Sequence, residues 1–252
     1  MRRHLRLLLA IVTAVLLLAA VAGYAWLNDL ADPMPEAEAA LRSSESVTVT
    51  TDGWLTFSPA DPSGTGVIFY PGGRVSAEAY APPMRAIAEA GHLAVITPMP
   101  FGLAVLSPDA ADGVIDAHPE VDQWIIAGHS LGGAMAAQYA AGHEDIDGLA
   151  LWAAYPPDGT DLSDGDVAVT SIFATEDGLA TLEDIEASTD QLPEDTAFVE
   201  IEGGNHAQFG WYGEQDGDGV ATISREDQQE QVVAATLALI GDVAAVGDVP
   251  AP

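Results

Sequence analysis

The stretch that decides the fold is Trp124-Ile125-Ile126-Ala127-Gly128-His129-Ser130-Leu131-Gly132-Gly133. Its apolar start, residues 124–127, predicts a buried strand, and the alanine-rich run 131–141 predicts a helix. Between them, Gly128-x-Ser130-x-Gly132 is typical of a sharp strand–turn–helix junction that holds a serine on a strained turn. Glycine at both flanking positions removes side chains that would collide inside such a turn. We therefore predict that Ser130 is a nucleophile rather than an ordinary surface serine.

Strand-like and helix-like runs alternate on both sides of this junction. The expected strands cover residues 47–51, 54–57, 66–70, 93–97, 124–127, 148–153, 167–174 and 196–201, and the expected helices cover 76–90, 108–117, 131–141, 179–191 and 225–240. Asp52-Gly53 joins the first two strands as a hairpin. The order predicts an α/β fold, with a doubly wound, mostly parallel sheet flanked by helices and preceded by an N-terminal hydrophobic helix.

The N-terminal segment predicts export from the cytoplasm. Three arginines precede the apolar residues 7–27, which as a helix would extend about 31 Å and could cross a bilayer core of about 30 Å. The alternative is a cleavable signal peptide with Ala20-Val21-Ala22 at the cleavage site. Both interpretations place the rest of the chain outside the cytoplasmic membrane. The expected organisation is an anchor or signal segment (1–28), a linker (29–45), one α/β domain (46–243) and a tail (244–252).

The charge composition limits the partners. The 252 residues contain 39 Asp and Glu against 7 Arg, without lysine, for a net charge of −32. Such a surface repels nucleic acid and anionic lipid headgroups, so we expect no nucleic-acid partner and membrane contact only through the N-terminal segment. A salt-adapted protein and a merely acidic exported protein explain the charge equally well. Without cysteine, disulfides and cysteine-based metal sites are excluded.

A serine nucleophile needs a base, which can be sought by elimination among six histidines. Five have simpler explanations: His4 in the N-terminal segment, His92 and His118 in turns, His143 at a helix end, and His129 inside the tight turn, where we expect a structural role pointing away from the base position. His206 remains. It lies in the loop Gly203-Gly204-Asn205-His206 after the last predicted strand, and functional groups of parallel sheets lie beyond the carboxyl ends of strands. We predict that His206 is the base.

The acid that orients this base should follow another strand, between the serine and the histidine in the chain. The strand 167–174 is followed by Thr175-Glu176-Asp177-Gly178. Asp177 and Glu176 both qualify. We favour Asp177, because Gly178 permits a sharp turn while the short side chain stays in place.

Two backbone donors are expected to stabilise a negative charge that develops on the substrate oxygen. The N–H of Leu131 begins the helix after the serine. Pro71-Gly72-Gly73 follows the strand 66–70, and we favour Gly73 as the second donor, with Arg74 as a neighbouring substrate contact. Aromatic residues in loops after strands are candidates for lining the pocket, although packing explains each equally well: Phe101, Trp152, Tyr155 and Trp211.

A metal or cofactor is not expected. The acidic turn Glu214-Gln215-Asp216-Gly217-Asp218-Gly219 alternates oxygen ligands with glycines, as calcium loops do. It lacks the downstream glutamate that completes such a loop. We therefore interpret it as a solvated turn.

The Gly-His-Ser-Leu-Gly-Gly stretch, the Pro-Gly-Gly loop and the order Ser130, Asp177, His206 together resemble the α/β-hydrolase superfamily. Within it, the chain is similar to small members without a lid domain, of the dienelactone hydrolase-like and esterase-like group. It departs from dienelactone hydrolases by carrying Ser130 where they have cysteine, and from many lipases by lacking a His-Gly start to the Pro71-Gly72-Gly73 loop. The resemblance implies hydrolysis of a small-molecule ester through an acyl-enzyme. The alternative is a catalytically silent binding protein of this fold, held at a membrane.

Overall fold

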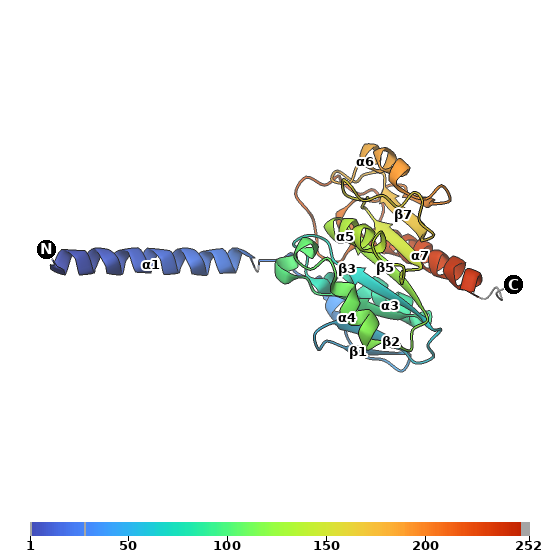
Figure 1. The fold of residues 1–252 in the computed structure, drawn as a ribbon, viewed down its shortest axis with the longest axis horizontal. Coiled ribbons are helices and arrows are strands. Elements are labelled where there is room, and N and C mark those ends of the chain that lie inside the picture. The colour runs from blue at the N-terminus through green and yellow to red at the C-terminus, as the bar shows by residue number, and fades with distance from the viewer. Residues whose placement is uncertain (1, 28, 248–252) are drawn as a thin grey trace. The chain divides into compact units, whose positions relative to one another are not determined.

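A computed structural model of the chain describes residues 2–27 and 29–247 (Figure 1). It divides into two compact units, Met1–Leu30 and Ala31–Pro252. The first unit contains the long helix α1 (Arg2–Leu27). Among the described residues, no helix is both long enough and apolar enough to cross a membrane. The prediction of a transmembrane helix within residues 1–28 is therefore not supported, and positions 1 and 28 of that segment lie outside the described residues.

The second unit is built of alternating strands and helices. Its strands are β1 (Val47–Thr50), β2 (Leu55–Pro59), β3 (Thr65–Tyr70), β4 (Leu93–Ile96), β5 (Gln123–His129), β6 (Gly148–Trp152), β7 (Ala168–Ala174) and β8 (Ala197–Ile201). Its α-helices are α2 (Pro35–Ala40), α3 (Ala81–Glu89), α4 (Ala110–Ala117), α5 (Leu131–Ala140), α6 (Leu182–Ala187) and α7 (Arg225–Gly247). Short 3-10 helices are η1 (Ala77–Tyr80), η2 (Pro100–Gly102), η3 (Ala104–Leu106), η4 (Thr189–Gln191) and η5 (Ala207–Phe209).

The strands form one sheet in the order β1-β2-β4-β3-β5-β6-β7-β8. The pairs β1–β2 and β2–β4 are antiparallel, and every other pair is parallel. The mostly parallel sheet predicted from the sequence is thereby confirmed. Strand β5 lies in the middle of the sheet, hydrogen-bonded to β3 and β6. The residues after β3, β5, β7 and β8 consequently meet at the same end of the sheet.

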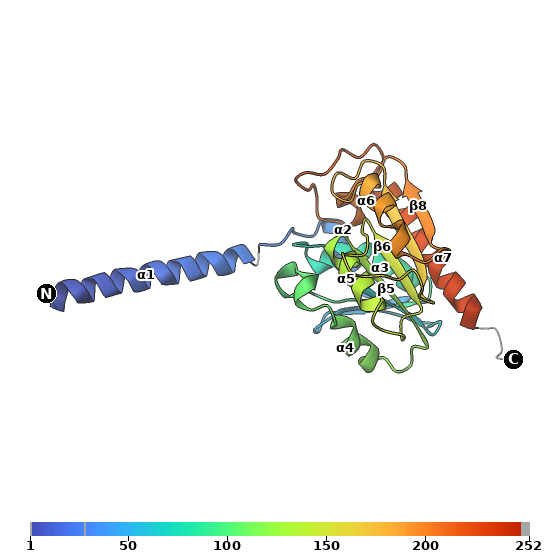
Figure 2. The same ribbon diagram turned by 45° about the horizontal axis from the view of Figure 1, so that its top comes forward.

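Helices cover both faces of the sheet, as Figure 2 shows. On one face, Met84 of α3 and Leu239 of α7 belong to one buried cluster with the sheet residues. On the other face, Val114 of α4 and Ala136 of α5 belong to a second cluster. This two-faced burial explains why the central strands are continuous apolar runs instead of alternating ones.

Three predicted helices begin later than expected, α4 at Ala110 and two others for an identifiable local reason. Residues 76–90 form η1 and then α3, because Pro82 and Pro83 favour a helix start at Ala81. Ser76 precedes η1 but makes no capping hydrogen bond. Helix α6 begins at Leu182, where Thr181 and Asp184 form a capping box.

The expected linker, residues 29–45, contains structure that belongs to the second unit. Helix α2 packs against α3 and η1 and buries Ala37 and Ala40. Ahead of it, the N–H of Ala31 donates to the carbonyl of Arg74, and the N–H of Met34 donates to the carbonyl of Trp211. These contacts tie the segment to the loops after β3 and β8.

Candidate active site

Ser130 occupies a strained turn between β5 and α5. Its backbone has φ +51° and ψ −122°, a conformation that a non-glycine residue rarely adopts. The turn is tight enough to require the flanking glycines. A Cβ on Gly132 would lie 2.1 Å from the carbonyl oxygen of Tyr70, and a Cβ on Gly128 would lie 2.5 Å from the carbonyl carbon of Gly132. The Gly-x-Ser-x-Gly spacing is therefore a steric requirement of this junction.

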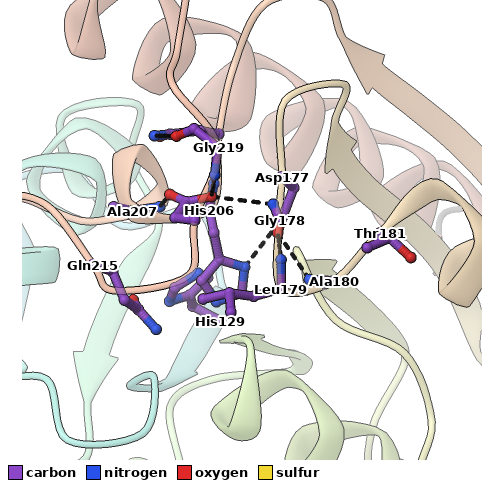
Figure 3. Close-up of polar contacts among 12 residues, drawn as sticks. His129, Asp177, Gly178, Leu179, Ala180, Thr181, His206, Ala207, Gln215 and Gly219 are labelled. Carbon is purple, nitrogen blue, oxygen red and sulfur yellow. Dashed lines mark hydrogen bonds and ion pairs between the residues drawn. The ribbon is translucent and has the colours of Figure 1, made fainter.

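Asp177 and His206 form a buried hydrogen-bonded pair. Oδ2 of Asp177 lies 2.8 Å from Nδ1 of His206, and their side chains are 0% and 1% exposed (Figure 3). The second carboxylate oxygen accepts the N–H groups of Leu179 and Ala180, each at 2.8 Å. Three hydrogen bonds thus compensate the burial of the carboxylate. Glu176, the alternative acid, is exposed.

The other ring nitrogen of His206, Nε2, has no hydrogen-bond partner among the described residues and could accept a proton. It is buried, and no hydrogen bond joins it to Ser130. The base nevertheless lies beside the tight turn, because the rings of His206 and His129 are 4.5 Å apart. Catalytic hydrogen bonds are often formed only when substrate is bound. The structure therefore brings Asp177 and His206 together and places His206 next to the residue that precedes Ser130.

The prediction that His129 points away from the base is wrong, because its ring centroid lies 4.5 Å from that of His206. Nδ1 of His129 is 2.8 Å from the hydroxyl of Tyr80, and that hydroxyl also accepts the N–H of Gly72 at 3.1 Å. Burial, and then the charge of His206, lower the pKa of His129 well below its usual value. Burial also raises the pKa of Tyr80 well above its usual value. Both rings therefore stay neutral, with the Tyr80 hydroxyl donating to His129.

The two predicted oxyanion donors come from adjacent loops. The N–H of Gly72 is used by Tyr80, and that of Arg74 donates to the carbonyl of Gly102 at 2.7 Å. Gly73 lies between them, close enough to the elbow helix that a Cβ on it would be 3.2 Å from Cδ2 of Leu131. Leu131 is the first residue of α5, where backbone N–H groups lack partners within the helix.

Comparison with known proteins identifies the family to which this chain belongs. A profile of the alpha/beta hydrolase family matches residues 66–230, which include all but the first residue of β3, the strands β4 to β8 and all three predicted catalytic residues. The chain belongs to this family. The resemblance seen in the sequence is thereby confirmed.

Solved structures share the fold of this hydrolase. A protein from Thermus thermophilus is 15% identical, with a TM-score of 0.56 over 78% of this chain and 98% of its own. Esterase 2 from Thermogutta terrifontis is 15% identical, with a TM-score of 0.55 over 79% and 97%. A putative alpha/beta hydrolase from Agrobacterium tumefaciens is 15% identical, with a TM-score of 0.57 over 82% and 100%. At such identities the likeness shows the fold alone. No curated protein matches the chain.

The predicted pocket residues of the hydrolase have different environments. Trp152 is fully buried and its indole N–H donates to Thr236 of α7, so of the two explanations left open, packing in the core applies to this residue. Trp211 is also buried, at 7% exposure, and Tyr155 is half-buried. Phe101 is 39% exposed. Both Phe101 and Arg74 have positive φ, at 55° and 64°, as Ser130 does.

Three of the four remaining histidines have partners away from the active site. His92 bonds to Ser63, His118 to Glu120, and His143 to the carbonyl of Tyr139. His4 lies among residues whose side chains are outside the described part. The elimination that selects His206 therefore agrees with the environments of His92, His118 and His143.

The acidic turn 214–219 contains a residue that the sequence analysis missed. Asp218 is not a solvated charge, because its carboxylate accepts backbone N–H groups from the loops that carry Asp177 and His206. Within the described residues, no group of three or more metal-ligating side chains is present. The sequence of the turn gave no indication of the contacts that Asp218 makes, since they join segments distant in the chain.

A cavity of about 770 Å³ opens at the opposite end of the sheet. It is lined by residues at the amino ends of strands, among them Gln123, Asp147 and Ala168. Catalytic groups of parallel sheets lie at the carboxyl ends. This cavity is therefore separate from Ser130 and His206.

Proposed function

We propose that this protein is a serine hydrolase that cleaves carboxylic esters through an acyl-enzyme on Ser130. The observation that carries the proposal is the buried Asp177–His206 hydrogen bond, with Nε2 of the histidine left unpaired beside the strained turn of Ser130. A serine hydroxyl is a weak nucleophile until such a base removes its proton. Strain at a non-glycine residue is typical of functional positions.

The proposed reaction has two steps. Nε2 of His206 takes the hydroxyl proton of Ser130 while Oγ attacks the ester carbonyl, and Asp177 stabilises the charged imidazole through Nδ1. The backbone N–H groups of Leu131 and Gly73 bind the oxyanion. The imidazolium then protonates the departing alcohol, leaving an acyl-enzyme. Water, deprotonated by His206, attacks the acyl-enzyme, which releases the acid and restores Ser130.

The structural relatives support the choice of an ester as substrate. Esterase 2 from Thermogutta terrifontis is described as phosphoramylated by tabun, and another structure of it as butyrate-bound. The Rhodothermus marinus protein that also shares the fold is described as an esterase domain. These properties belong to those proteins. They guide the choice of p-nitrophenyl esters and a fluorophosphonate as probes for this one.

Replacement of Ser130 tests the proposal. We expect Ser130→Ala to lower kcat for p-nitrophenyl esters by about a thousandfold or more and to abolish covalent labelling by a fluorophosphonate. The matched control is Ser163→Ala, which removes a half-buried serine whose hydroxyl donates to Asp161 in the loop before β7, and it should leave both measurements unchanged. Melting curves of both variants show whether the fold is intact. Retained hydrolysis or labelling in a folded Ser130→Ala protein would refute the nucleophile.

We also propose that the hydrolase domain acts outside the cytoplasmic membrane. The support comes from the sequence: arginines at positions 2, 3 and 6 precede the apolar residues 7–27, and acidic residues follow them. Mass spectrometry of the mature N-terminus distinguishes a retained segment from cleavage after Ala22. A fractionation that finds the protein inside the cytoplasm contradicts export in either form.

A further inference from the structure

One side chain in the acidic turn links the two loops that carry the proposed acid and base. Oδ1 of Asp218 accepts the N–H of Gly178 at 3.2 Å and the N–H of His206 at 3.1 Å. Oδ2 accepts the N–H of Ala207 at 2.8 Å. Gly178 follows Asp177 directly in the chain. One carboxylate therefore holds the backbone of the acid loop (residues 175–180) and of the base loop (residues 203–210) at a common point.

The turn fits tightly between these loops. A Cβ on Gly219 would lie 2.0 Å from the carbonyl oxygen of Glu176, and a Cβ on Gly178 would lie 2.5 Å from that of Gly217. In the base loop, the side-chain amide of Asn205 donates to the carbonyl of Gly219 at 2.8 Å. Figure 3 shows Gly178, Ala207 and Gly219 beside the Asp177–His206 pair. The acidic turn thus acts as a spacer between the two loops.

We propose that Asp218 is a positioning residue that sets the geometry of the Asp177–His206 pair by holding both loops through their backbone N–H groups. The inference rests on the proposed function, because it assigns Asp218 to the acid–base pair of that reaction. Asp218 does not contact substrate in this account. It acts through the backbone of its two neighbours.

A carboxylate suits this role for a geometric and an electrostatic reason. Its two oxygens offer about four acceptor positions, and Oδ1 also accepts the N–H of Gly219 at 2.8 Å. Hydrogen bonds to a charged acceptor are about twice as strong as neutral ones. An asparagine has nearly the same shape but replaces one oxygen with an NH₂ group. That group would face backbone donors instead of accepting from them.

Arg225 complements Asp218 on the base loop. Its guanidinium donates to the carbonyls of Ala207, Gly210 and Gly213. The backbone after His206 is thus held at its N–H groups by a carboxylate and at its carbonyl groups by an arginine. Two opposite charges fix one loop, which leaves the His206 ring little freedom to move relative to Asp177.

The test compares Asp218→Asn with Asp216→Asn in the full chain. Asp216 lies in the same turn and is exposed, so its variant removes the same charge without touching either loop. We expect Asp218→Asn to lower kcat for a p-nitrophenyl ester by about 10- to 100-fold while KM changes less than about twofold, because small misplacements of catalytic groups are costly. The low-field proton resonance of the His206–Asp177 hydrogen bond should also shift or broaden. Asp216→Asn should match the wild type in all these measurements.

Hydrogen exchange on the wild-type protein gives an independent measurement that needs no variant to fold. The amides of Gly178, His206 and Ala207 lie in loops but donate to Asp218, so we expect them to exchange slowly and with similar protection. Exchange at the rate of unprotected loop amides overturns the proposal. So does an Asp218→Asn protein whose kcat and proton resonance equal those of Asp216→Asn.

Two further variants separate the inference from the function on which it rests. If Ser130→Ala and His206→Ala are inactive but Asp218→Asn is fully active, the serine hydrolase stands and the role of Asp218 fails. If Ser130→Ala and His206→Ala remain active, the proposed function itself fails. Equal losses in Asp218→Asn and Asp216→Asn indicate a general charge effect, which also overturns the role of Asp218.

Discussion

His129 is an uncharged residue at the centre of a strongly acidic protein. It is 1% exposed, stacks on Phe209 and is hydrogen-bonded through Nδ1 to the hydroxyl of Tyr80. Because Tyr80 in turn binds the N–H of Gly72, a buried chain of hydrogen bonds runs from the nucleophile turn to the predicted oxyanion loop. Protonation of His129 would break this chain. Burial of the neutral His129 ring should therefore make the folded protein less stable at low pH.

We predict that His129 makes the protein sensitive to mild acid. Its folded pKa is depressed well below the usual 6.5, mainly by burial, whereas the unfolded chain titrates near 6.5. Below that pH the unfolded state binds one more proton than the folded state, so stability is complete above pH 6.5 and falls as the pH drops. The loss is about 1.4 kcal/mol per pH unit, or about 2 kcal/mol by pH 5.

Urea unfolding at pH 7, 6 and 5 measures this effect in the wild type and in His129→Gln. The glutamine removes the titrating group, while the carboxylates that also titrate are common to both proteins. We expect the stability advantage of the wild type over the variant to shrink by about 2 kcal/mol between pH 7 and pH 5. A difference that stays constant over this range would contradict the assignment.

Single residues differ in how far the sequence reveals them. His206 and Asp177 could be selected because each lies in the loop that follows a predicted strand, a property of the local sequence. Asp218 could not be found in this way, since its hydrogen bond to Gly178 joins residues 40 positions apart. The local sequence likewise does not show where Trp152 lies, because an aromatic residue at a strand end can face the core or the pocket. Only packing against α7 places it in the core.

At the scale of elements, residues 31–34 form a short strap across the active-site end. The N–H of Ala31 donates to Arg74, the N–H of Ser76 donates to the carbonyl of Ala31, and the N–H of Met34 donates to Trp211. The strap thus connects the loop of Gly73 with the loop that follows His206. The two prolines and scattered charges of residues 29–45 predict a linker. The sequence alone does not reveal the strap, because its hydrogen-bond partners lie far away in the chain.

Truncation should reveal this role. We predict that a protein beginning at Ala31 keeps kcat within about twofold of the full chain, whereas one beginning at Pro35 loses about tenfold in kcat and also melts at a lower temperature. The longer deletion removes three backbone hydrogen bonds, each worth about 0.5–1.5 kcal/mol, from the loops that hold the candidate catalytic groups. Ester hydrolysis and melting curves of both proteins provide the measurement. Equal activity of the two would show that the strap is dispensable.

The elements themselves were largely predictable. Strands are short apolar runs bounded by glycine, proline or charge, so their expected ends lie close to the observed ones. Helix starts were less predictable where backbone N–H groups at the expected start are hydrogen-bonded to residues outside the helix. The N–H groups of Leu179 and Ala180 bind Asp177, for example, which delays α6 to Leu182.

At the scale of the whole molecule, the net charge of −32 is a cost to folding. Like charges repel across the compact surface, and salt screens this repulsion, with a Debye length of about 10 Å at 0.1 M and about 3 Å at 1 M.

We predict that the melting temperature rises by several degrees between 0.1 M and 2 M NaCl, with most of the gain at the lower concentrations where screening changes fastest. Potassium chloride should have the same effect, because screening depends on ionic strength. A melting temperature that varies by less than about one degree over this range contradicts the screening account. It would favour an acidic protein without a salt requirement.

The amino-acid sequence was enough to predict the fold class, the order of strands along the chain, Ser130 and His206 as candidates, and an acid at Asp177 or Glu176. Apolar periodicity, glycine spacing and position after a strand are local properties, so they can be read without coordinates. The three-dimensional arrangement was needed to show that Asp177, and not the exposed Glu176, meets His206, and that Asp218 joins their loops. Those choices depend on hydrogen bonds between segments far apart in the chain, which form only after the sheet has brought its strand ends together.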